Sequence, residues 1–179
     1  MNKRWWVVLG LGLLVILVGI MFFYFALYNP ESGETRTLKN PTDGRTVAQS
    51  VLEFDESFVE YLLYSVKANE LHNPPLSSDK PKIQASIGDK VYNAYVQNGV
   101  VYFDSDETEN PDLVLTTSTE EAVRMVMDRA YIQDSFGSDR SKVELRASKS
   151  LLFAKGYLRV YTELTGKSIT GGVVKIYLD

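Results

Sequence analysis

The residues whose types could support catalysis are few in this chain. His72 is the only histidine, and there is no cysteine with which it could share a metal ion or form a thiolate pair. A serine hydrolase needs a G-x-S-x-G turn to present its nucleophile, and the sequence contains no such turn. Any two carboxylates could do acid–base work, but no pair is singled out by its spacing. The sequence therefore predicts that the protein is not an enzyme, with no catalytic residues and no cofactor.

Residues 165–168, "TGKS", match the end of a phosphate-binding loop. That loop needs another glycine five residues before Gly166, and the chain has Tyr161 there. The segment also follows a helix-like stretch, whereas the loop normally follows a strand. We therefore expect no nucleotide site.

An acidic run could attract calcium through carboxylate oxygens. Its spacing does not fit a calcium-binding helix–loop–helix, because Glu109 stands where glycine is needed and Leu115 where the bidentate glutamate belongs. We expect a solvated acidic loop and no metal site. The run consists of Asp104, Asp106, Glu107, Glu109 and Asp112.

Charge excludes one large class of partners. The chain has 179 residues, is 45% hydrophobic and has a formal net charge of -4. Without Lys3 and Arg4 it keeps 17 basic residues against 23 acidic ones, a net charge near -6. Nucleic-acid binding depends largely on concentrated positive charge, so no nucleic acid is expected as a partner.

Residues 5–28 form an uncharged, strongly apolar stretch behind Lys3 and Arg4. About 24 residues at roughly 1.5 Å each would cross the hydrocarbon core of a bilayer. A cleaved signal peptide is the alternative, but its apolar region is normally shorter and ends in small residues. The basic flank predicts a single-pass membrane protein with a cytoplasmic N-terminus and an extracytoplasmic C-terminal domain. We divide the chain into an anchor (1–29), a linker (30–45) and an α+β domain (46–179).

The first part of the predicted domain has helical periodicity. Thr46 with Gln49 three residues later forms a capping-box pattern. Apolar residues then recur every three or four positions, which predicts one amphipathic helix over residues 46–66. Its apolar stripe is expected to pack in the core, with a partner-binding face as the alternative. The stripe comprises Val47, Val51, Phe54, Phe58, Leu62 and Val66.

From Lys82 onward, apolar residues recur at every second position, which predicts strands. The runs "KIQASIG", "VYNAYVQ" and "VVYFDS" are separated by Gly88-Asp89 and by residues 98–99, Asn-Gly, which is a strong hairpin signal. "DLVLTTS" predicts a fourth strand, and Ser118 with Glu121 predicts a capping box that opens the next helix. "SKVELRAS" predicts a fifth strand, residues 149–166 a helix despite Gly156, and "GGVVKIYLD" a final strand.

This order of elements resembles the sterol carrier protein 2-like family. "PDLVLTTSTEEAVRMV" is similar to the family's strand-to-helix junction, and "KVELRASKSLLFAKGYLRVY" to its last strand and helix. The chain departs from the pattern where a glycine usually ends that strand, since Ser148 and Lys149 stand there. The resemblance covers residues 45–164. It implies an α+β domain with a mainly antiparallel sheet of five to six strands, covered by helices on one face.

The resemblance also implies an apolar tunnel that binds lipid-like molecules. Such a site is lined by hydrophobic side chains and carries no chemical motif. The same residues would equally fill a solid core, and this alternative stays open. The predicted lining residues are Val126, Met127, Ile132, Phe136, Leu151, Leu152, Phe153 and Leu158.

Two functions follow from these expectations. The first is a membrane-anchored, non-catalytic domain that binds or presents a lipid or other apolar small molecule, with the bilayer itself contacted through residues 5–28. The second is a ligand-free interaction or sensor module that docks another envelope protein. The sequence identifies neither the ligand nor a protein partner.

Overall fold

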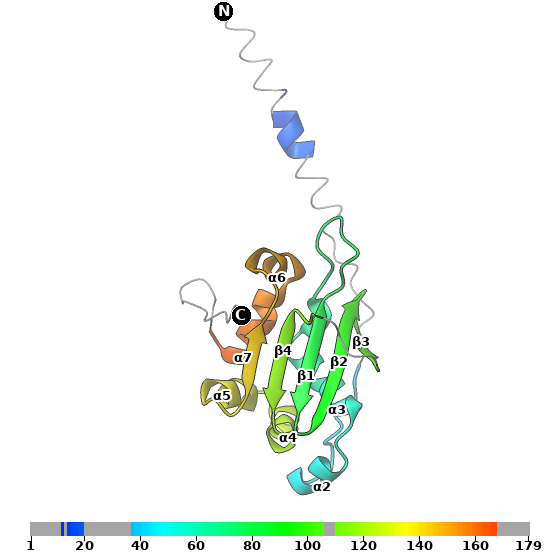
Figure 1. Ribbon diagram of the computed structural model, residues 1–179, viewed down its shortest axis with the longest axis vertical. Coiled ribbons are helices and arrows are strands. Elements are labelled where there is room, and N and C mark those ends of the chain that lie inside the picture. Colours follow the sequence, from blue (N-terminus) through cyan, green and yellow to red (C-terminus); the bar gives the residue numbers. More distant parts are fainter. Residues whose placement is uncertain (1–11, 13, 20–36, 106–109, 168–179) are drawn as a thin grey trace, which may run out of the picture. The chain divides into compact units, whose positions relative to one another are not determined.

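The computed structural model describes residues 12, 14–19, 37–105 and 110–167 of the chain (Figure 1). The helices are α2 (Val47–Leu52), α3 (Glu56–Ser65), α4 (Thr119–Met127), α5 (Tyr131–Gly137), α6 (Lys149–Lys155) and α7 (Tyr157–Thr165), with a 3-10 turn η1 (Ala68–Glu70). The strands are β1 (Lys82–Ile87), β2 (Lys90–Gln97), β3 (Val100–Asp104), β4 (Leu113–Thr117) and β5 (Lys142–Leu145).

The five strands form one mixed sheet in the order β3-β2-β1-β4-β5. β1, β2 and β3 make the predicted antiparallel meander, and β4 pairs with β5 antiparallel. β4 lies parallel to β1, with Ile83 beside Leu113. The expectation of a mainly antiparallel sheet is therefore corrected to a mixed one. A period of two indicates a strand but not its direction, which is why the sequence did not reveal the parallel pair.

One face of the sheet carries the core. Along β1, Ile83, Ala85 and Ile87 are buried, while the residues between them are half-exposed. The helices lie on the side of the buried residues (Figure 1). The α+β class and the helix layer over the sheet are as predicted. On the other face, the rings of Tyr95 and Tyr102 stack at 5.3 Å between centroids, and Lys80 Nζ lies 4.5 Å above Tyr95.

The helix predicted over residues 46–66 is two helices. The Thr46 capping box is confirmed, since Thr46 Oγ1 accepts from Gln49 N and the Gln49 side chain accepts from Thr46 N. Asp55 interrupts the helix that the apolar periodicity predicted, because its carboxylate accepts a hydrogen bond from Ser57 N at 2.9 Å and caps a new helix, α3. An aspartate favours extended backbone at such a cap, so the apolar period continues through a break in the helix.

A second break divides the helix predicted over residues 149–166. Gly156 has a φ of +86°, a left-handed conformation that glycine adopts without steric cost. α6 ends there and α7 begins with the next residue. The predicted final strand in residues 171–179 lies outside the described residues.

The predicted membrane span, residues 5–28, lies mostly outside the described residues. Within the described part of the chain, no helix combines the length and the apolar character needed to cross a membrane. This finding corrects the predicted single-pass localisation. The chain divides into two units, Met1–Ser32 and Gly33–Asp179, and the finer division at residues 29 and 45 stays a prediction.

Candidate functional site

The apolar layer between sheet and helices contains five of the eight predicted lining residues. Ile132 and Leu152 are each 2% exposed and belong to a continuous cluster of buried side chains. The structure therefore brings together side chains from α4, α5 and α6, and their role as a tunnel lining stays a prediction. The five residues are Val126, Met127, Ile132, Phe136 and Leu152.

The other three lining residues lie toward solvent. Leu151 and Leu158 are half-buried, and Phe153 is 70% exposed. Leu152 and Phe153 are neighbours on α6, so their side chains point about 100° apart and only one of them can face the core. Apolar periodicity around a helix break did not reveal which one it would be.

The loop before β1, residues 72–81, carries a second exposed apolar residue. Leu76 is 99% exposed and has a φ of +61°, in the left-handed region. It is the third residue of a turn that Ser77 N closes by donating to Pro74 O at 3.0 Å. Glycine is the usual residue at such a position, so the turn holds a leucine at some steric cost.

A buried ion pair joins this loop to α6. Lys155 is 1% exposed, and its ammonium makes three short contacts: 2.9 Å to Asp112 Oδ2, 2.9 Å to Asp79 Oδ2 and 3.0 Å to Lys80 O. His72 N also donates to Lys155 O at 3.3 Å. All three protons of the ammonium thus have acceptors, and both ends of the loop are fixed to α6.

Asp112 is the centre of this cluster. Its Oδ2 accepts from Lys155, from Lys82 N at 2.9 Å and from the hydroxyl of Tyr157 at 3.0 Å. Its backbone N donates to Lys82 O, and its backbone O accepts from Arg146 N at 2.8 Å. Burial, followed by the nearby Asp112 carboxylate, raises the pKa of Tyr157 well above its usual value. The expected solvated acidic loop is corrected at Asp112, which ties β1, β4, β5 and α7 together.

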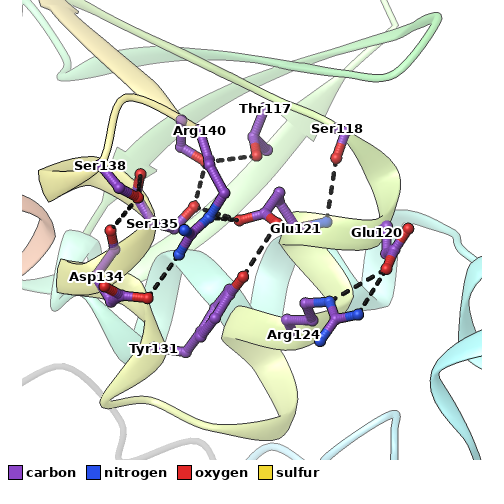
Figure 2. A network of polar contacts seen from close by, with 11 residues as sticks. Thr117, Ser118, Glu120, Glu121, Arg124, Tyr131, Asp134, Ser135, Ser138 and Arg140 are labelled. Atoms are coloured by element: carbon purple, nitrogen blue, oxygen red, sulfur yellow. Dashed lines mark hydrogen bonds and ion pairs between the residues drawn. The ribbon is translucent and has the colours of Figure 1, made fainter.

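A second polar network surrounds Glu121 (Figure 2). The Glu121 carboxylate accepts from Tyr131 Oη at 3.1 Å, Ser135 Oγ at 2.6 Å and Arg140 Nε at 3.2 Å. Burial alone would raise the pKa of Glu121, but hydrogen bonds from Ser135, Tyr131 and Arg140 outweigh it and hold the pKa below its usual value.

Glu121 was predicted to close a capping box with Ser118. Half of this prediction is confirmed, because Ser118 Oγ accepts from Glu121 N at 3.2 Å. The carboxylate instead turns toward α5, where it contacts Tyr131 and Ser135. The helix is therefore capped by the serine alone, and the glutamate joins α4 to α5.

A chain of buried hydroxyls continues from Glu121 into the sheet. Ser135 Oγ lies 2.8 Å from Ser141 Oγ, which lies 2.6 Å from Thr117 Oγ1. An ionised carboxylate only accepts, so Ser135 donates to Glu121, Ser141 donates to Ser135, and Thr117 donates to Ser141. The chain thus connects β4 and α5 through buried hydroxyls with one consistent direction.

Both networks hold elements of the fold together. The Glu121 carboxylate is held by three side chains, and Lys155 and Asp112 are buried in contact with each other. Among the described residues, no group of three metal-binding side chains comes together. Sequence reasoning missed both networks. Lys155 three positions after the buried Leu152 was one available signal, because that spacing places a charge on the buried side of α6.

Comparisons with known proteins give distant similarities. No protein-family model matches the chain. No curated protein matches it either. A crystal structure of the MycE methyltransferase from the mycinamycin biosynthetic pathway is similar at a TM-score of 0.38 and 9% identity, over 68% of this chain. The chain spans 38% of that methyltransferase.

Two solved structures carry the name of the family that the sequence resembles. Sterol carrier protein 2 like 2 from Aedes aegypti gives a TM-score of 0.31 at 16% identity, over 55% of this chain and 92% of that one. Sterol carrier protein 2 from Yarrowia lipolytica, in its apo form, gives 0.30 at 17% identity, over 68% and 88%. These TM-scores are too low to assign a fold by similarity, so the fold class is taken from the helices and strands of this chain itself. It is an α+β domain whose apolar layer lies between a mixed sheet and helices.

Proposed function

We propose that the domain binds an apolar, lipid-like molecule at the layer between its sheet and its C-terminal helices, without catalysing a reaction. The observation that carries the proposal is a gradient of exposure along α6 and α7. Leu152 is buried in the core, Leu151 and Leu158 are half-buried, and Phe153 is exposed. Apolar side chains thus continue from the core to the surface at the place where the helix is broken.

Such a gradient suits an apolar ligand. A site for a lipid-like molecule is lined mainly by hydrophobic side chains and needs few polar groups. The buried charged groups at α6 are already satisfied, since Lys155 and Asp112 bind each other. The C-terminal helices therefore present apolar surface beside a rigid polar anchor, and an apolar molecule would gain by covering Leu151 and Phe153.

A second candidate function is a ligand-free module that docks another protein. It is favoured by the tight burial of Ile132 and Leu152, which is as expected for a solid core. An exposed aromatic residue such as Phe153 is also a frequent contact in protein interfaces. The two candidates differ in whether a small molecule reaches the layer.

Photo-crosslinking distinguishes them. The full-length chain would be irradiated with a fatty acid that carries a diazirine, digested, and mapped by peptide mass spectrometry. Crosslinks in residues 149–164 that an excess of unlabelled fatty acid suppresses would support the proposal. Crosslinks confined to the apolar residues 5–28, or none, would contradict it and favour the docking module.

A matched pair of variants tests whether the ligand site lies at α6. Leu151→Gln should weaken crosslinking to α6, because it places an amide among the apolar side chains. Leu52→Gln changes an exposed leucine on α2 and should leave crosslinking unchanged. Equal effects of the two substitutions would contradict a site at α6.

A further inference from the structure

Two exposed apolar side chains lie on elements that the structure holds together. Leu76 is on the loop of residues 72–81, and Phe153 is on α6. The loop is bound to α6 at both ends, through His72 N to Lys155 O and through Lys155 Nζ to Lys80 O and Asp79. Figure 1 shows α6 and this loop at the same end of the sheet. Leu76 and Phe153 therefore belong to two segments that hydrogen bonds and an ion pair join, which we call the α6–loop platform (residues 72–82 and 146–155).

The charge of this platform is opposite to that of the chain. Residues 72–82 and 146–155 carry five basic side chains and one acidic one, but Lys155 is buried against Asp112 and Arg146 pairs with Glu144, so the net charge with these two partners included is +2. The whole chain has 19 basic and 23 acidic residues, so the remaining residues carry 14 and 20, a net charge of -6. The basic residues are Lys80, Lys82, Arg146, Lys149 and Lys155, and the acidic one is Asp79.

Basic and apolar side chains share the outer side of α6. Lys149 and Phe153 are four residues apart, so they lie on the same side of the helix, and both are exposed. Leu152 and Lys155 occupy the opposite, buried side. This arrangement, apolar side chains flanked by lysine and arginine, matches a negatively charged surface with an apolar interior.

The turn that carries Leu76 adds a conformational argument. A leucine in the left-handed region is strained, and at 99% exposure it gains no burial in return. Two adjacent prolines, Pro74 and Pro75, fix φ at the two positions before Leu76 and so restrict the turn. Local strain of this kind is found where a side chain serves binding better than stability.

We infer that the α6–loop platform docks onto an anionic lipid surface, with Leu76 and Phe153 entering the interface and Lys149 contacting the headgroups. This docking needs no ligand in the apolar layer, so it can be tested separately from the proposed function, although both use the exposed Phe153. A surface of anionic lipid offers both components that the platform matches, negative charge outside and hydrocarbon beneath.

The absence of cysteine gives a direct test. Leu76→Cys in the full-length chain would be labelled with an environment-sensitive fluorophore and mixed with phosphatidylcholine vesicles, with or without phosphatidylserine. Leu52→Cys is the matched control, because Leu52 is also an exposed leucine, 87% exposed, but lies on α2. Any association through residues 5–28 is common to both labelled chains, so the difference between the two positions is the readout.

The proposal predicts a fluorescence increase at position 76 with anionic vesicles, a smaller one with neutral vesicles, and none at position 52. Lys149→Ala should weaken the response at position 76 by about five-fold in apparent affinity, the effect of one basic residue near an anionic surface. Phe153→Ser should weaken it as well, while unfolding in urea checks that both variants remain folded. Equal signals at both positions, or no signal at position 76, would overturn the proposal and leave a protein as the occupant of the platform.

Discussion

The ammonium of Lys155 lies 2.9 Å from Oδ2 of Asp112, and both side chains are buried. Neither charge has access to water, so each depends on the other and on the hydrogen bonds around it. Lys155 comes from the end of α6, whereas Asp112 immediately precedes β4, 43 residues earlier. This pair therefore fixes the C-terminal helices to the centre of the sheet.

Removing one member of the pair should be strongly destabilising. Lys155→Met leaves the Asp112 carboxylate buried without its cationic partner, with Lys82 N and Tyr157 Oη still donating to it, and we expect the free energy of unfolding to fall by about 3–5 kcal/mol. Asp112→Asn should be destabilising by a smaller amount, because the buried ammonium keeps its contacts with Asp79 and Lys80 O. Unfolding in urea, followed by circular dichroism, measures both.

Two controls separate this effect from general damage. The double variant Lys155→Met with Asp112→Asn should lose less than the sum of the single variants, since neither charge is left alone. Glu53→Gln breaks the exposed pair with Arg45 and should cost less than about 1 kcal/mol. Strictly additive losses would contradict a coupled pair.

Stability in acid should depend on Glu121. The unfolded carboxyl titrates near 4.5, and the folded carboxyl has a lower pKa. The folded state thus binds fewer protons, so the contribution of Glu121 is complete above about pH 4.5 and is lost as the pH falls through the folded pKa. Urea unfolding between neutral pH and pH 3 should show this decline.

Glu121→Gln should flatten that decline, because the amide does not titrate. Glu163 provides a second test: hydrogen bonding to Lys67, outweighing the opposing effect of burial, lowers its pKa in the same direction. Glu163→Gln should therefore remove a further part of the acid dependence. An unchanged slope in Glu121→Gln would mean that the carboxylate does not hold its hydrogen bonds in solution.

Two neighbouring residues on α6 should respond very differently to truncation. Leu152→Ala removes a side chain that is 2% exposed, and the cavity left behind should cost about 2–5 kcal/mol. Phe153→Ala removes a side chain that is 70% exposed and should change the free energy of unfolding by no more than about 0.5 kcal/mol. Comparable losses would mean that Phe153 is buried in solution.

Replacing Leu76 should not cost stability. Leu76→Gly relieves the left-handed backbone strain, and we expect the free energy of unfolding to stay unchanged or to rise by up to about 1 kcal/mol. Leu52→Gly is the matched case in a right-handed helix and should lower it by up to about 1 kcal/mol. A large loss in Leu76→Gly would show that this leucine packs against the protein.

The sequence predicted the meander best, because its signals are local. The Asn-Gly pair at residues 98–99 and the glycine at residue 88 mark two short turns, and the observed strands begin and end within two residues of the predicted runs. The helix N-caps Thr46 and Ser118 were also predicted from the sequence and are confirmed. These features depend on neighbours in the chain, so a single sequence contains them.

Features that depend on contacts between residues far apart in the chain could not be predicted from the sequence. The parallel direction of β4, the pairing of Lys155 with Asp112 and the turning of Glu121 toward Ser135 all require the folded arrangement. For the same reason, the predicted lining residues include both Leu152, which is buried, and Phe153, which is exposed. Their role in a ligand site stays a prediction, and packing decided which side of α6 is buried.

The parallel pair of β1 and β4 has a consequence for the route by which the chain folds. β1, β2 and β3 are contiguous within residues 82–104 and can assemble from local hairpins, whereas β4 must close a loop of 30 residues back to Lys82. Until it does so, one edge of β1 is an unpaired strand. Before Asp112 reaches Lys82, the partly formed sheet can therefore pair with a strand of another chain through the free edge of β1. Self-association during refolding should increase when the pairing of β4 with β1 is slowed.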